Sequence, residues 1–517
     1  MSEKDMAVIP EDAFRQSGRL AQKNNILAAK IVAETIRTTL GPKGMDKMLV
    51  DPSGSVTVTN DGVTILQEMQ IEHPAAKMVV EVAKTQEDEV GDGTTTAVVF
   101  AGELLKQAES LLEKEVHPTI ITKGYQLAAL KAQSVLQNIA KNVTIADIDI
   151  LQKIAMTAMT GKGAESSKEE LAKVVVNAVI AHPKRESVRV EKKVGGETSQ
   201  SELIKGVVLD KQKVHPGMPT SVEHAKIALL NVPLEIRDTE IDAKISITDP
   251  AQMQQFLDME ESMLKKMVDQ VAESGATVVL CQKGIDDVAQ YLLSKHGIYA
   301  ARRVKRSDME ALAKATGANI VTNISDLSST DIGAAGRVEE VMVNDEAMTY
   351  VRNCPNPKSV TILVRGSTEH VISEVKRALE DAIGDVICAI ESRYVVAGAG
   401  SCEVELSKQL HVYADSLSGK EQLAVKAFSV ALDILPQTLA ENAGLDPIDV
   451  LAELKAKHDE GEKWSGINVF TGKVMDAFAE GVLEPISIKS QAISSATEVA
   501  TMILRIDDVI AANRTEE

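Results

Sequence analysis

Apolar residues recur at helical spacing near the start of the chain. From Asn25 to Leu40 they recur mostly every three or four positions, which predicts an amphipathic helix. Gly41-Pro42 ends that helix, because glycine forms the terminal turn and proline cannot continue it. The pattern then changes to short β-branched runs at Lys47–Val50 and Ser55–Thr59, with a turn at 51–54. These runs predict a β-hairpin.

The next long segment, from Ala75 to about Gln137, is rich in Ala, Val and Leu and predicts a helical bundle. His73-Pro74 and His117-Pro118 are typical of helix starts with proline at the first position, so both histidines are expected to be structural. From Leu406 onward the chain is again Ala- and Leu-rich and helical in pattern. Met502–Ala511 is expected to be a final strand.

The middle of the chain has a different pattern, in which short buried-type strands alternate with helices. The predicted strands are Ala225–Leu230, Thr277–Cys281, Tyr299–Arg302, Asn319–Val321 and Ser359–Val364. The predicted helices are Asp286–Lys295, Ser307–Thr316 and Thr368–Ile383. This alternation predicts a compact α/β unit. Because the two chain ends share a character that the middle lacks, we expect one domain to be inserted within another.

Inside the α/β unit lies a charged insertion, Asp238–Gln270, whose helix carries an apolar stripe. The helix carries Leu257, Leu264, Met267, Val268 and Val271, and Phe256 and Met259 lie near its start. A helix that presents Met and Leu from a charged insertion could be a partner-binding edge. A stripe that faces the core is the commoner case, and the residues alone favour it.

Composition narrows the class of protein. At 517 residues the chain is too long for one core, so about three domains are expected. The net charge of −20 argues against a nucleic-acid-binding surface. The four cysteines form no C-x-x-C pair, which indicates neither a zinc site nor a disulfide framework and fits a reducing cytosol. We expect no signal peptide, and no apolar run approaches the ~20 residues of a membrane span.

The stretch with the clearest chemistry is Gly91-Asp92-Gly93-Thr94-Thr95-Thr96. Glycines let backbone N–H groups approach a ligand, and the threonines fall on the first turn of a predicted helix, whose free N–H groups and dipole suit phosphate. Asp92 would repel bare phosphate but suits Mg²⁺, which takes one or two carboxylates and leaves its other positions to phosphates and water. A glycine-rich turn before a Thr-capped helix explains the same residues about equally well.

Other candidate residues are spread along the chain. They are the turn at Gly41-Pro42, Asp61 beside Gly62, Lys162 between two glycines, and Asp381 in a predicted helix. Phosphoryl transfer to water needs a metal-bridged phosphate, a carboxylate that orients the water and a cation, and these residues offer each part. Taken singly, a helix stop, a turn-forming Asp and a surface lysine are the commoner explanations. No G-x-x-x-x-G-K-[ST] sequence occurs, so this is not a standard P-loop protein.

Several of these stretches resemble the signature motifs of the chaperonins. The motifs are Leu40–Leu49, Val58–Gly62 and Val90–Thr96. The similarity extends through His73–Ala76, Thr160–Ala164, Gln282–Asp287, Asn468–Gly472 and Arg505–Asp508. It covers nearly the whole chain, and the fuller match is to the group II chaperonins, specifically archaeal thermosome subunits.

The resemblance implies a multidomain α and α/β architecture, the chaperonin fold. A mostly helical equatorial ATP-binding domain would be built from both chain ends, with a small intermediate hinge domain and an α/β apical substrate-binding domain inside it. The segment near 238–270 would be a helical protrusion that forms a built-in lid, which favours the partner-binding interpretation of its helix. The implied segments are 1–144 and 403–517 (equatorial), 145–216 and 368–402 (intermediate), and 217–367 (apical).

The resemblance also implies roles for individual residues. Asp61 and Asp381 would position and activate the attacking water, Lys162 would sense the γ-phosphate, and Asp92 would bind Mg²⁺. Because Lys162 and Asp381 fall in the implied intermediate domain, the site would be complete only when that domain closes. The other implied ATP or ADP contacts are Leu40, Gly41, Pro42, Asn60, Gly91, Gly93, Thr94, Thr95, Thr96, Gly400, Asn468 and Glu484.

The activity implied by the resemblance is an ATP-dependent chaperone. Identical or sister subunits would form two stacked rings of roughly eight or nine, with the hairpin and the last strand offering edges for neighbours. The chamber would bind unfolded client proteins in the cytoplasm and close its built-in lid on ATP hydrolysis, without a separate lid protein, nucleic acid or membrane. One alternative is a Mg²⁺-dependent ATPase or phosphotransferase without a chamber, although the α/β unit shows no acceptor site. The other is a passive holdase ring, against which the intact Asp61, Asp92 and Asp381 argue.

Overall fold

The computed structural model describes residues 14–54, 56–236, 250–343, 346–355 and 359–511. The chain divides into two compact units, of which the first combines residues 1–176 with 377–517 and the second comprises residues 177–376. The prediction that one domain is inserted within another is therefore confirmed at this level. The finer division into five segments stays a prediction.

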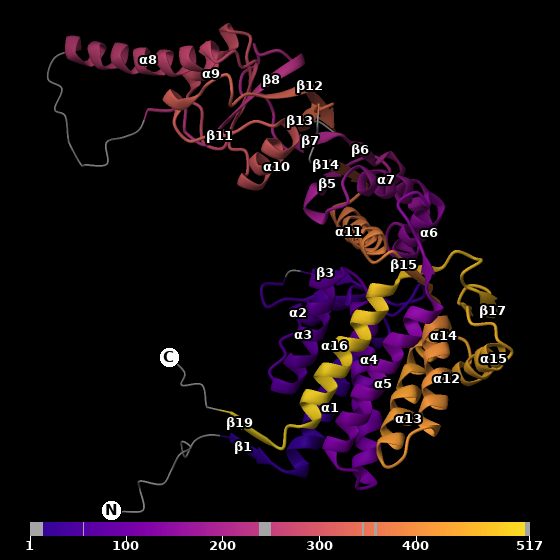
Figure 1. Cartoon of the computed structure of the whole chain (residues 1–517). Helices are drawn as coiled ribbons and strands as arrows, with labels where there is room; N and C mark the ends of the chain where they lie inside the picture. Colours follow the sequence, from indigo (N-terminus) through magenta and orange to yellow (C-terminus); the bar gives the residue numbers. More distant parts are fainter. Residues whose placement is uncertain (1–13, 55, 237–249, 344–345, 356–358, 512–517) are drawn as a thin grey trace, which may run out of the picture. The chain divides into compact units, whose positions relative to one another are not determined.

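The first unit is built mainly of helices from both chain ends (Figure 1). Helices α4 and α16 lie side by side near its centre, with α1, α3, α5 and α13 packed around them. Proline begins α3 and α5, and His73 and His117 cap these helices by accepting hydrogen bonds from Ala75 N and Thr119 N, so their structural roles are confirmed. The helices of this bundle are α1 (Arg19–Arg37), α3 (Pro74–Glu89), α4 (Thr94–Glu113), α5 (Pro118–Ile139), α12 (Ser401–Asp415), α13 (Glu421–Leu432), α14 (Ile434–Asn442) and α16 (Ile486–Leu504).

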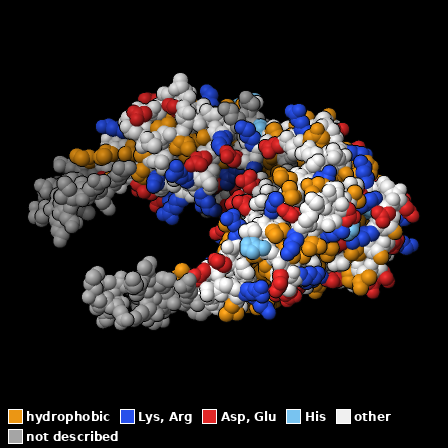
Figure 2. Space-filling model, turned by 60° about the horizontal axis from the view of Figure 1, so that its bottom comes forward, with side chains coloured by type: hydrophobic (Ala, Val, Ile, Leu, Met, Phe, Trp, Pro, Cys, Tyr) orange, Lys and Arg blue, Asp and Glu red, His pale blue; other side chains and the backbone are white. Residues whose placement is uncertain are grey.

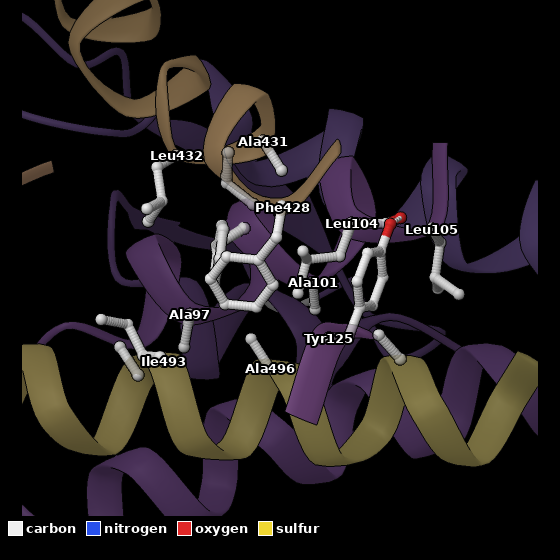
Figure 3. Packing of buried hydrophobic residues seen from close by; sticks show 14 of the residues in the cluster. Ala97, Ala101, Leu104, Leu105, Tyr125, Phe428, Ala431, Leu432, Ile493 and Ala496 are labelled. Atoms are coloured by element: carbon white, nitrogen blue, oxygen red, sulfur yellow. Dashed lines mark hydrogen bonds between the residues drawn. The ribbon is translucent and has the colours of Figure 1, made fainter. Parts of the chain in front are cut away.

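The core of this bundle joins the two ends of the chain through side chains (Figure 3). Phe428 of α13 meets Phe100 of α4 edge-on, with ring centroids 5.3 Å apart, and meets Tyr125 of α5 at 5.7 Å. The Tyr125 hydroxyl donates a hydrogen bond to the backbone oxygen of Leu104 at 2.7 Å, so its polar group is satisfied inside the core. Aromatic residues are scarce in the chain, and three of them pack together at this one junction.

Shorter elements of the first unit carry its loops. The hairpin β2 (Lys47–Val50) and β3 (Val56–Thr59) is confirmed as predicted. The other helices are α2 (Gly62–Glu68), α6 (Ile148–Met159) and α15 (Pro447–Asp459), with α7 (Lys168–Ala181) and α11 (Glu369–Ser392) containing the points where the units divide. The other strands are β1 (Phe14–Ser17), β4 (Lys141–Asn142), β15 (Tyr394–Ala397), β16 (Ser465–Asn468), β17 (Lys473–Asp476), β18 (Leu483–Pro485) and β19 (Asp508–Ala511).

Two of the predicted elements differ from the structure. The predicted final strand Met502–Ala511 is wrong over its first half, because residues up to Leu504 complete α16 and only Asp508–Ala511 form β19. Strand β19 pairs with β1 in antiparallel register, from Phe14 opposite Ala511 to Ser17 opposite Asp508. The predicted helix Thr368–Ile383 continues to Ser392 as α11.

The second unit contains a seven-stranded mixed sheet. Strands β8, β9 and β10 run parallel, whereas β12, β13 and β7 extend the sheet in antiparallel order, and β11 pairs with β8. The predicted strands from Ala225 to Val321 and the predicted helices Asp286–Lys295 and Ser307–Thr316 are confirmed to within a few residues. The elements are β7 (Gly206–Leu209), β8 (Ser221–Leu230), β9 (Val278–Cys281), β10 (Tyr299–Ala301), β11 (Ile320–Val321), β12 (Gly333–Val343), β13 (Glu346–Arg352), α8 (Pro250–Glu273), α9 (Asp287–Lys295) and α10 (Arg306–Thr316).

A second sheet, of three strands, is formed by strands close to the two predicted ends of the implied apical segment. Strand β14 (Val360–Gly366) pairs with β5 (Val188–Val194) and β6 (Glu202–Ile204), and not with the seven-stranded sheet. Conversely, Gly206 begins β7, which belongs to the larger sheet. The borders predicted at residues 216 and 367 therefore cut across the observed strand pairing on both sides.

Helix α8 occupies most of the predicted insertion. Its C-terminal half is core-facing, because Leu264, Val268 and Val271 are buried in the cluster that covers one face of the larger sheet. Met259 and Met263 are 59% and 45% exposed, so the stripe leaves the core toward the N-terminal half of the helix. Residues 237–249 and the side chains of Phe256 and Leu257 lie outside the described part of the chain.

The charges on the surface and the burial of one long apolar helical stretch are relevant to membrane association. Figure 2 shows acidic and basic side chains interspersed over the face in view. By length and composition, Glu421–Asn442 could cross a membrane, but 72% of its most apolar window is buried in the fold. Burial of this kind is typical of a core helix, so the stretch is weak evidence for a membrane span.

Candidate functional site

The first turn of α4 follows a glycine and has no side-chain cap. Gly93 precedes the helix in the left-handed region with φ of +80°, and no side chain caps the first turn. A Cβ at Gly93 would lie 2.7 Å from Ile488 Cγ2, so both the backbone conformation and the space demand glycine. The backbone N–H groups of Thr94, Thr95 and Thr96 therefore begin the helix without side-chain partners, as phosphate binding requires.

Asp92 is held in place beside this turn. Its Oδ1 accepts a hydrogen bond from Gly93 N at 2.7 Å, and its backbone oxygen accepts one from Gln86 Nε2 at 2.9 Å. Gln86 is fully buried and also donates to the backbone oxygen of Ile488 at 3.2 Å. Sequence reasoning missed Gln86, although a glutamine on the buried face of a helix is a recognisable signal.

Lys162 forms ion pairs with two carboxylates that were predicted to be site residues. Its Nζ lies 2.5 Å from Asp381 Oδ2 on α11 and 3.9 Å from Asp92 Oδ1. Burial alone would lower the pKa of Lys162, but Asp381 and Asp92 outweigh it and raise the pKa above its usual range. For Asp381, burial and the charges of Asp92 and Asp61 outweigh the attraction of Lys162, so its pKa is raised. The structure thus brings together residues that lie up to 289 positions apart.

Asp61 lies next to the same helix start. Its Oδ2 caps α2 by accepting hydrogen bonds from Thr64 N at 2.9 Å and Thr64 Oγ1 at 2.6 Å, which confirms the turn-forming role. A Cβ at Gly62 would lie 2.7 Å from Thr95 Oγ1, so this turn packs directly on the first turn of α4. Asn60 Nδ2 lies 3.5 Å from the backbone oxygen of Gly161 and links the turn to the Lys162 loop.

The Leu40-Gly41-Pro42 loop closes over the Lys162 loop. Gly41 has φ of +82°, and a Cβ there would lie 2.3 Å from Leu439 Cδ2. The backbone oxygen of Leu40 accepts a hydrogen bond from Asn442 Nδ2 at 2.9 Å. A Cβ at Gly161 would lie 2.5 Å from Pro42 Cα, so the two loops are in direct contact.

The remaining predicted contacts form a second group around the start of α12. Gly400 precedes this helix with φ of +77° and, like Gly93, leaves its first turn without a side-chain cap. The backbone oxygen of Ala399 accepts a hydrogen bond from Ile467 N at 3.0 Å, which places β16 and Asn468 beside it. Lys43 Nζ lies 5.2 Å from the ring centroid of Phe470, so the Asn468 loop also approaches the Gly41-Pro42 loop.

Glu484 is anchored by a lysine that sequence reasoning missed. Lys489 Nζ lies 2.7 Å from Glu484 Oε2 and 2.8 Å from Glu403 Oε1, whereas Glu403 Oε2 is buried without a hydrogen-bond partner. Burial, together with the charges of Glu403 and Asp92, raises the pKa of Glu484 despite the attraction of Lys489. Lys489 thus ties Glu484 to the first turn of α12, where Glu403 lies.

A further buried carboxylate lies between the groups. Asp385 follows Asp381 by one turn of α11, is almost fully buried, and has an Oδ1 without a hydrogen-bond partner. Burial, followed by the charge of Asp92, raises its pKa well above the ordinary value. A Cβ at Gly384 would lie 3.4 Å from the backbone oxygen of Val90, so α11 packs tightly on the loop that carries Asp92.

The donor set fits one type of metal better than others. Among the described residues, no group of three or more His, Cys, Asp or Glu side chains could hold a metal ion. A single carboxylate beside a helix N-terminus suits Mg²⁺ bound together with phosphate, because phosphate and water supply the other ligands. The residues present, with Asp92 as the protein ligand, therefore fit a Mg²⁺-nucleotide.

Comparison with known proteins gives one consistent result. Residues 32–514 match the model of the TCP-1/cpn60 chaperonin family. The chain is 60% identical to thermosome subunit beta of Methanothermobacter thermautotrophicus, over 99% of this chain and 95% of that protein. It is 59% identical to a thermosome subunit of Methanopyrus kandleri (98% and 95%) and 54% identical to thermosome subunit alpha of Archaeoglobus fulgidus (99% and 95%).

Proposed function

The chain belongs to the TCP-1/cpn60 chaperonin family, and from this premise we propose how its site binds and hydrolyses ATP. Similarity to thermosome subunits over nearly the full length makes it an ATP-dependent group II chaperonin, so an ATPase or phosphotransferase without a chamber is not favoured. What remains for proposal is the role of each residue, the metal, the clients and the assembly.

We assign the phosphates to the first turn of α4, where Gly93 and the N–H groups of Thr94, Thr95 and Thr96 lie. Gly91 gives the loop before this turn its left-handed bend, with φ of +84°. Asp92 would hold Mg²⁺, which would supply positive charge to offset that of the phosphates. Asp61 and Asp381 orient the attacking water, and Asp381 accepts its proton. Leu40, Gly41, Pro42 and Asn60 enclose the nucleotide, and Gly400, Asn468 and Glu484 hold its ribose and base.

The single observation that carries this assignment is the position of Lys162. Its ammonium is shared between Asp381 at 2.5 Å and Asp92 at 3.9 Å, which are the proposed base and the proposed metal ligand. A γ-phosphate held by Mg²⁺ at Asp92 would attract Lys162 away from Asp381. Such a transfer releases the carboxylate for catalysis only when ATP is present, which couples the chemistry to the nucleotide state.

The test removes both proposed water-activating carboxylates. Asp61→Ala combined with Asp381→Ala should bind ATP but lose turnover by roughly 10²- to 10⁴-fold, the usual contribution of a general base. Fluorescent-nucleotide titration measures binding, and phosphate release measures turnover. Glu113→Ala changes an exposed carboxylate at the end of α4 and should leave both unchanged. Undiminished turnover in the double variant would refute the assignment.

The partners are proposed from the same premise. Archaeoglobus fulgidus has thermosome subunits named alpha and beta, which indicates oligomers of identical or sister subunits. We propose two stacked cytoplasmic rings that enclose unfolded clients, with α8 as part of the built-in lid and no separate lid protein. The equatorial, intermediate and apical division of the sequence belongs to this proposal.

Native mass measures the assembly directly. With Mg²⁺-ATP the purified protein should form a particle of roughly sixteen to eighteen subunits, as two closed cyclic rings require. Native mass spectrometry with and without nucleotide gives the number. A monomer under both conditions, even after addition of a sister subunit, would contradict the ring.

A further inference from the structure

Gln86 is a polar residue on a helix face that is otherwise apolar. It lies in the last turn of α3 and has an exposed fraction of 0%. Its Oε1 is buried without a hydrogen-bond partner, a cost in stability that an apolar side chain of similar size would avoid. Packing alone therefore does not explain an amide here. The other buried residues of α3 are Ala75, Ala76, Val79, Val82 and Ala83.

The Gln86 amide donates hydrogen bonds to two backbone oxygens. Its Nε2 lies 2.9 Å from the backbone oxygen of Asp92 and 3.2 Å from that of Ile488 on α16. Backbone oxygens only accept hydrogen bonds, so the NH₂ group and not Oε1 must face both partners. The backbone oxygen of Gln86 in turn accepts hydrogen bonds from Val90 N at 3.1 Å and Gly91 N at 3.2 Å. One residue thus bonds three positions of the loop before α4.

The bond to Asp92 fixes the direction of the peptide between Asp92 and Gly93. This peptide is trans, so its C=O and N–H groups point in opposite directions. Because the C=O group points at Gln86, the N–H group of Gly93 points away from it and donates to Asp92 Oδ1 at 2.7 Å. The side chain of Asp92 is 32% exposed, so the carboxylate lies on the accessible side of the loop.

The bond to Ile488 reaches the helix that carries Lys489. Ile488 and Lys489 are neighbours in the first turn of α16, and Lys489 pairs with Glu484 at 2.7 Å. A Cβ at Gly93 would lie 2.7 Å from Ile488 Cγ2 and 3.1 Å from Gln86 Nε2, so the loop, the amide and α16 are in direct contact. Gln86 therefore joins the loop of the proposed metal ligand to the helix that anchors a proposed nucleotide contact.

We propose that Gln86 is a positioning residue whose amide orients the Asp92 carboxylate for Mg²⁺ and holds the Asp92 loop against α16. It acts through Asp92 and not by touching the nucleotide. The inference rests on the proposed function, because it takes Asp92 as the Mg²⁺ ligand.

Removal of the amide tests the role through nucleotide binding. Gln86→Met removes both donors and keeps an unbranched side chain of similar length. The affinity of the assembled protein for ADP in the presence of Mg²⁺ should fall by roughly three- to tenfold, as expected for lost hydrogen bonds that support a metal ligand. In EDTA the affinity should change less. Titration with a fluorescent ADP measures both, and an unchanged affinity in Mg²⁺, or an equal loss in Mg²⁺ and EDTA, would overturn the proposal.

A second glutamine provides the matched control. Gln133 of α5 donates from Nε2 to the backbone oxygen of Ser490 on α16 at 2.9 Å, two residues after Ile488. Gln133→Met therefore removes a glutamine bond to the same helix at a position outside the Asp92 loop. It should lower the temperature of thermal unfolding, as Gln86→Met does, but leave the affinity for ADP with Mg²⁺ unchanged. A loss of affinity as large as in Gln86→Met would mean that Gln86 acts through general stability, and would overturn the positioning role.

A double-mutant cycle separates failure of this inference from failure of the proposed function. When Asp92→Asn is already present, Gln86→Met should cost less than about twofold in affinity for ADP with Mg²⁺, because the ligand that it orients is gone. Additive losses would overturn the positioning role and leave Asp92 as the metal ligand. No loss in Asp92→Asn alone would refute the proposed metal ligand, and this role with it. If Gln86→Met does not assemble, Gln86→Asn takes its place in the cycle, since its shorter amide cannot reach both oxygens.

Discussion

Two ion-pair clusters among the candidate site residues contain the same kinds of charged group but differ in burial and geometry. Each is one lysine between two carboxylates: Lys162 with Asp381 and Asp92, and Lys489 with Glu403 and Glu484. Lys162 lies on a loop after α6, its side chain is 25% exposed, and its two distances are unequal at 2.5 and 3.9 Å. Lys489 lies on α16, is 11% exposed, and holds its partners at 2.8 and 2.7 Å.

The difference indicates that Lys162 can change its ion-pair partner, whereas Lys489 cannot. A lysine on a loop with one short and one long contact can move toward a new anion at small cost, because water still reaches it. A lysine on a central helix with two short contacts has no free direction. Its removal would leave the buried Glu403 and the partly buried Glu484 without this partner. We therefore expect the first cluster to serve catalysis and the second to serve stability and the shape of the base site.

The sharpest test replaces each lysine by methionine, which keeps most of the side-chain length. Lys489→Met should destabilise the first unit by about 3–5 kcal/mol, the usual cost of breaking a buried ion pair. Lys162→Met should change stability little but lower kcat by roughly 10²- to 10³-fold, as expected when a charge that stabilises the transition state is lost.

Thermal unfolding and single-turnover ATP hydrolysis distinguish the two effects. Lys205→Met, at a lysine in the second unit, serves as a control for loss of charge. The comparison would fail if Lys162→Met were as destabilised as Lys489→Met while its turnover stayed normal.

A smaller effect is expected from replacing Asp92, which belongs to the Lys162 cluster and is the proposed Mg²⁺ ligand. Asp92→Asn keeps the hydrogen-bond acceptor for Gly93 N but removes the charge that Mg²⁺ requires. The affinity for ATP in the presence of Mg²⁺ should fall by roughly 10- to 100-fold, as for the loss of a charged contact, whereas the affinity without Mg²⁺ should change less. Titration of ATP with and without EDTA measures both, and an equal loss under both conditions would remove Asp92 as the metal ligand.

The smallest expected effect is a shift in pH dependence. Because Asp381 has a raised pKa and must be ionised to accept a proton, kcat/KM should rise with pH through a value above the ordinary one of about 4. Lys162 opposes this rise of the pKa, so Lys162→Met should move the acidic limb to still higher pH by about one unit. Glu484→Gln should leave the limb in place. A limb unmoved in Lys162→Met would mean that the lysine does not control Asp381.

Local elements could be predicted where a residue pattern is compatible with only one type of secondary structure. The hairpin Lys47–Thr59 has a period of two around a turn, and the start of α4 follows directly from Gly93 and three threonines. The Met502–Leu504 segment was misassigned because a short apolar run fits a strand or the end of a buried helix equally well. Helix α11 passes through Gly384, a residue that weakens helices, because a glycine there allows close approach to Val90.

The site itself was predictable only in part. Asp61, Asp92, Lys162 and Asp381 were candidates from their chemistry, and the resemblance supplied their roles. No spacing rule could show that they meet, since tertiary packing alone brings them together. Gln86, Asp385, Glu403 and Lys489 were missed, although polar and charged residues in otherwise apolar helices are a usable signal of buried contacts.

The pairing of β1 with β19 has a consequence for synthesis on the ribosome. The first unit pairs Phe14–Ser17 with Asp508–Ala511, so it cannot be completed until residues 508–511 have been translated. The second unit, residues 177–376, emerges whole well before that and can fold while the N-terminal helices still wait for α12, α13 and α16. The nascent protein must therefore keep an unfinished apolar core in solution for the time needed to translate residues 377–511. At about 5–20 residues per second this takes roughly 7 to 27 seconds.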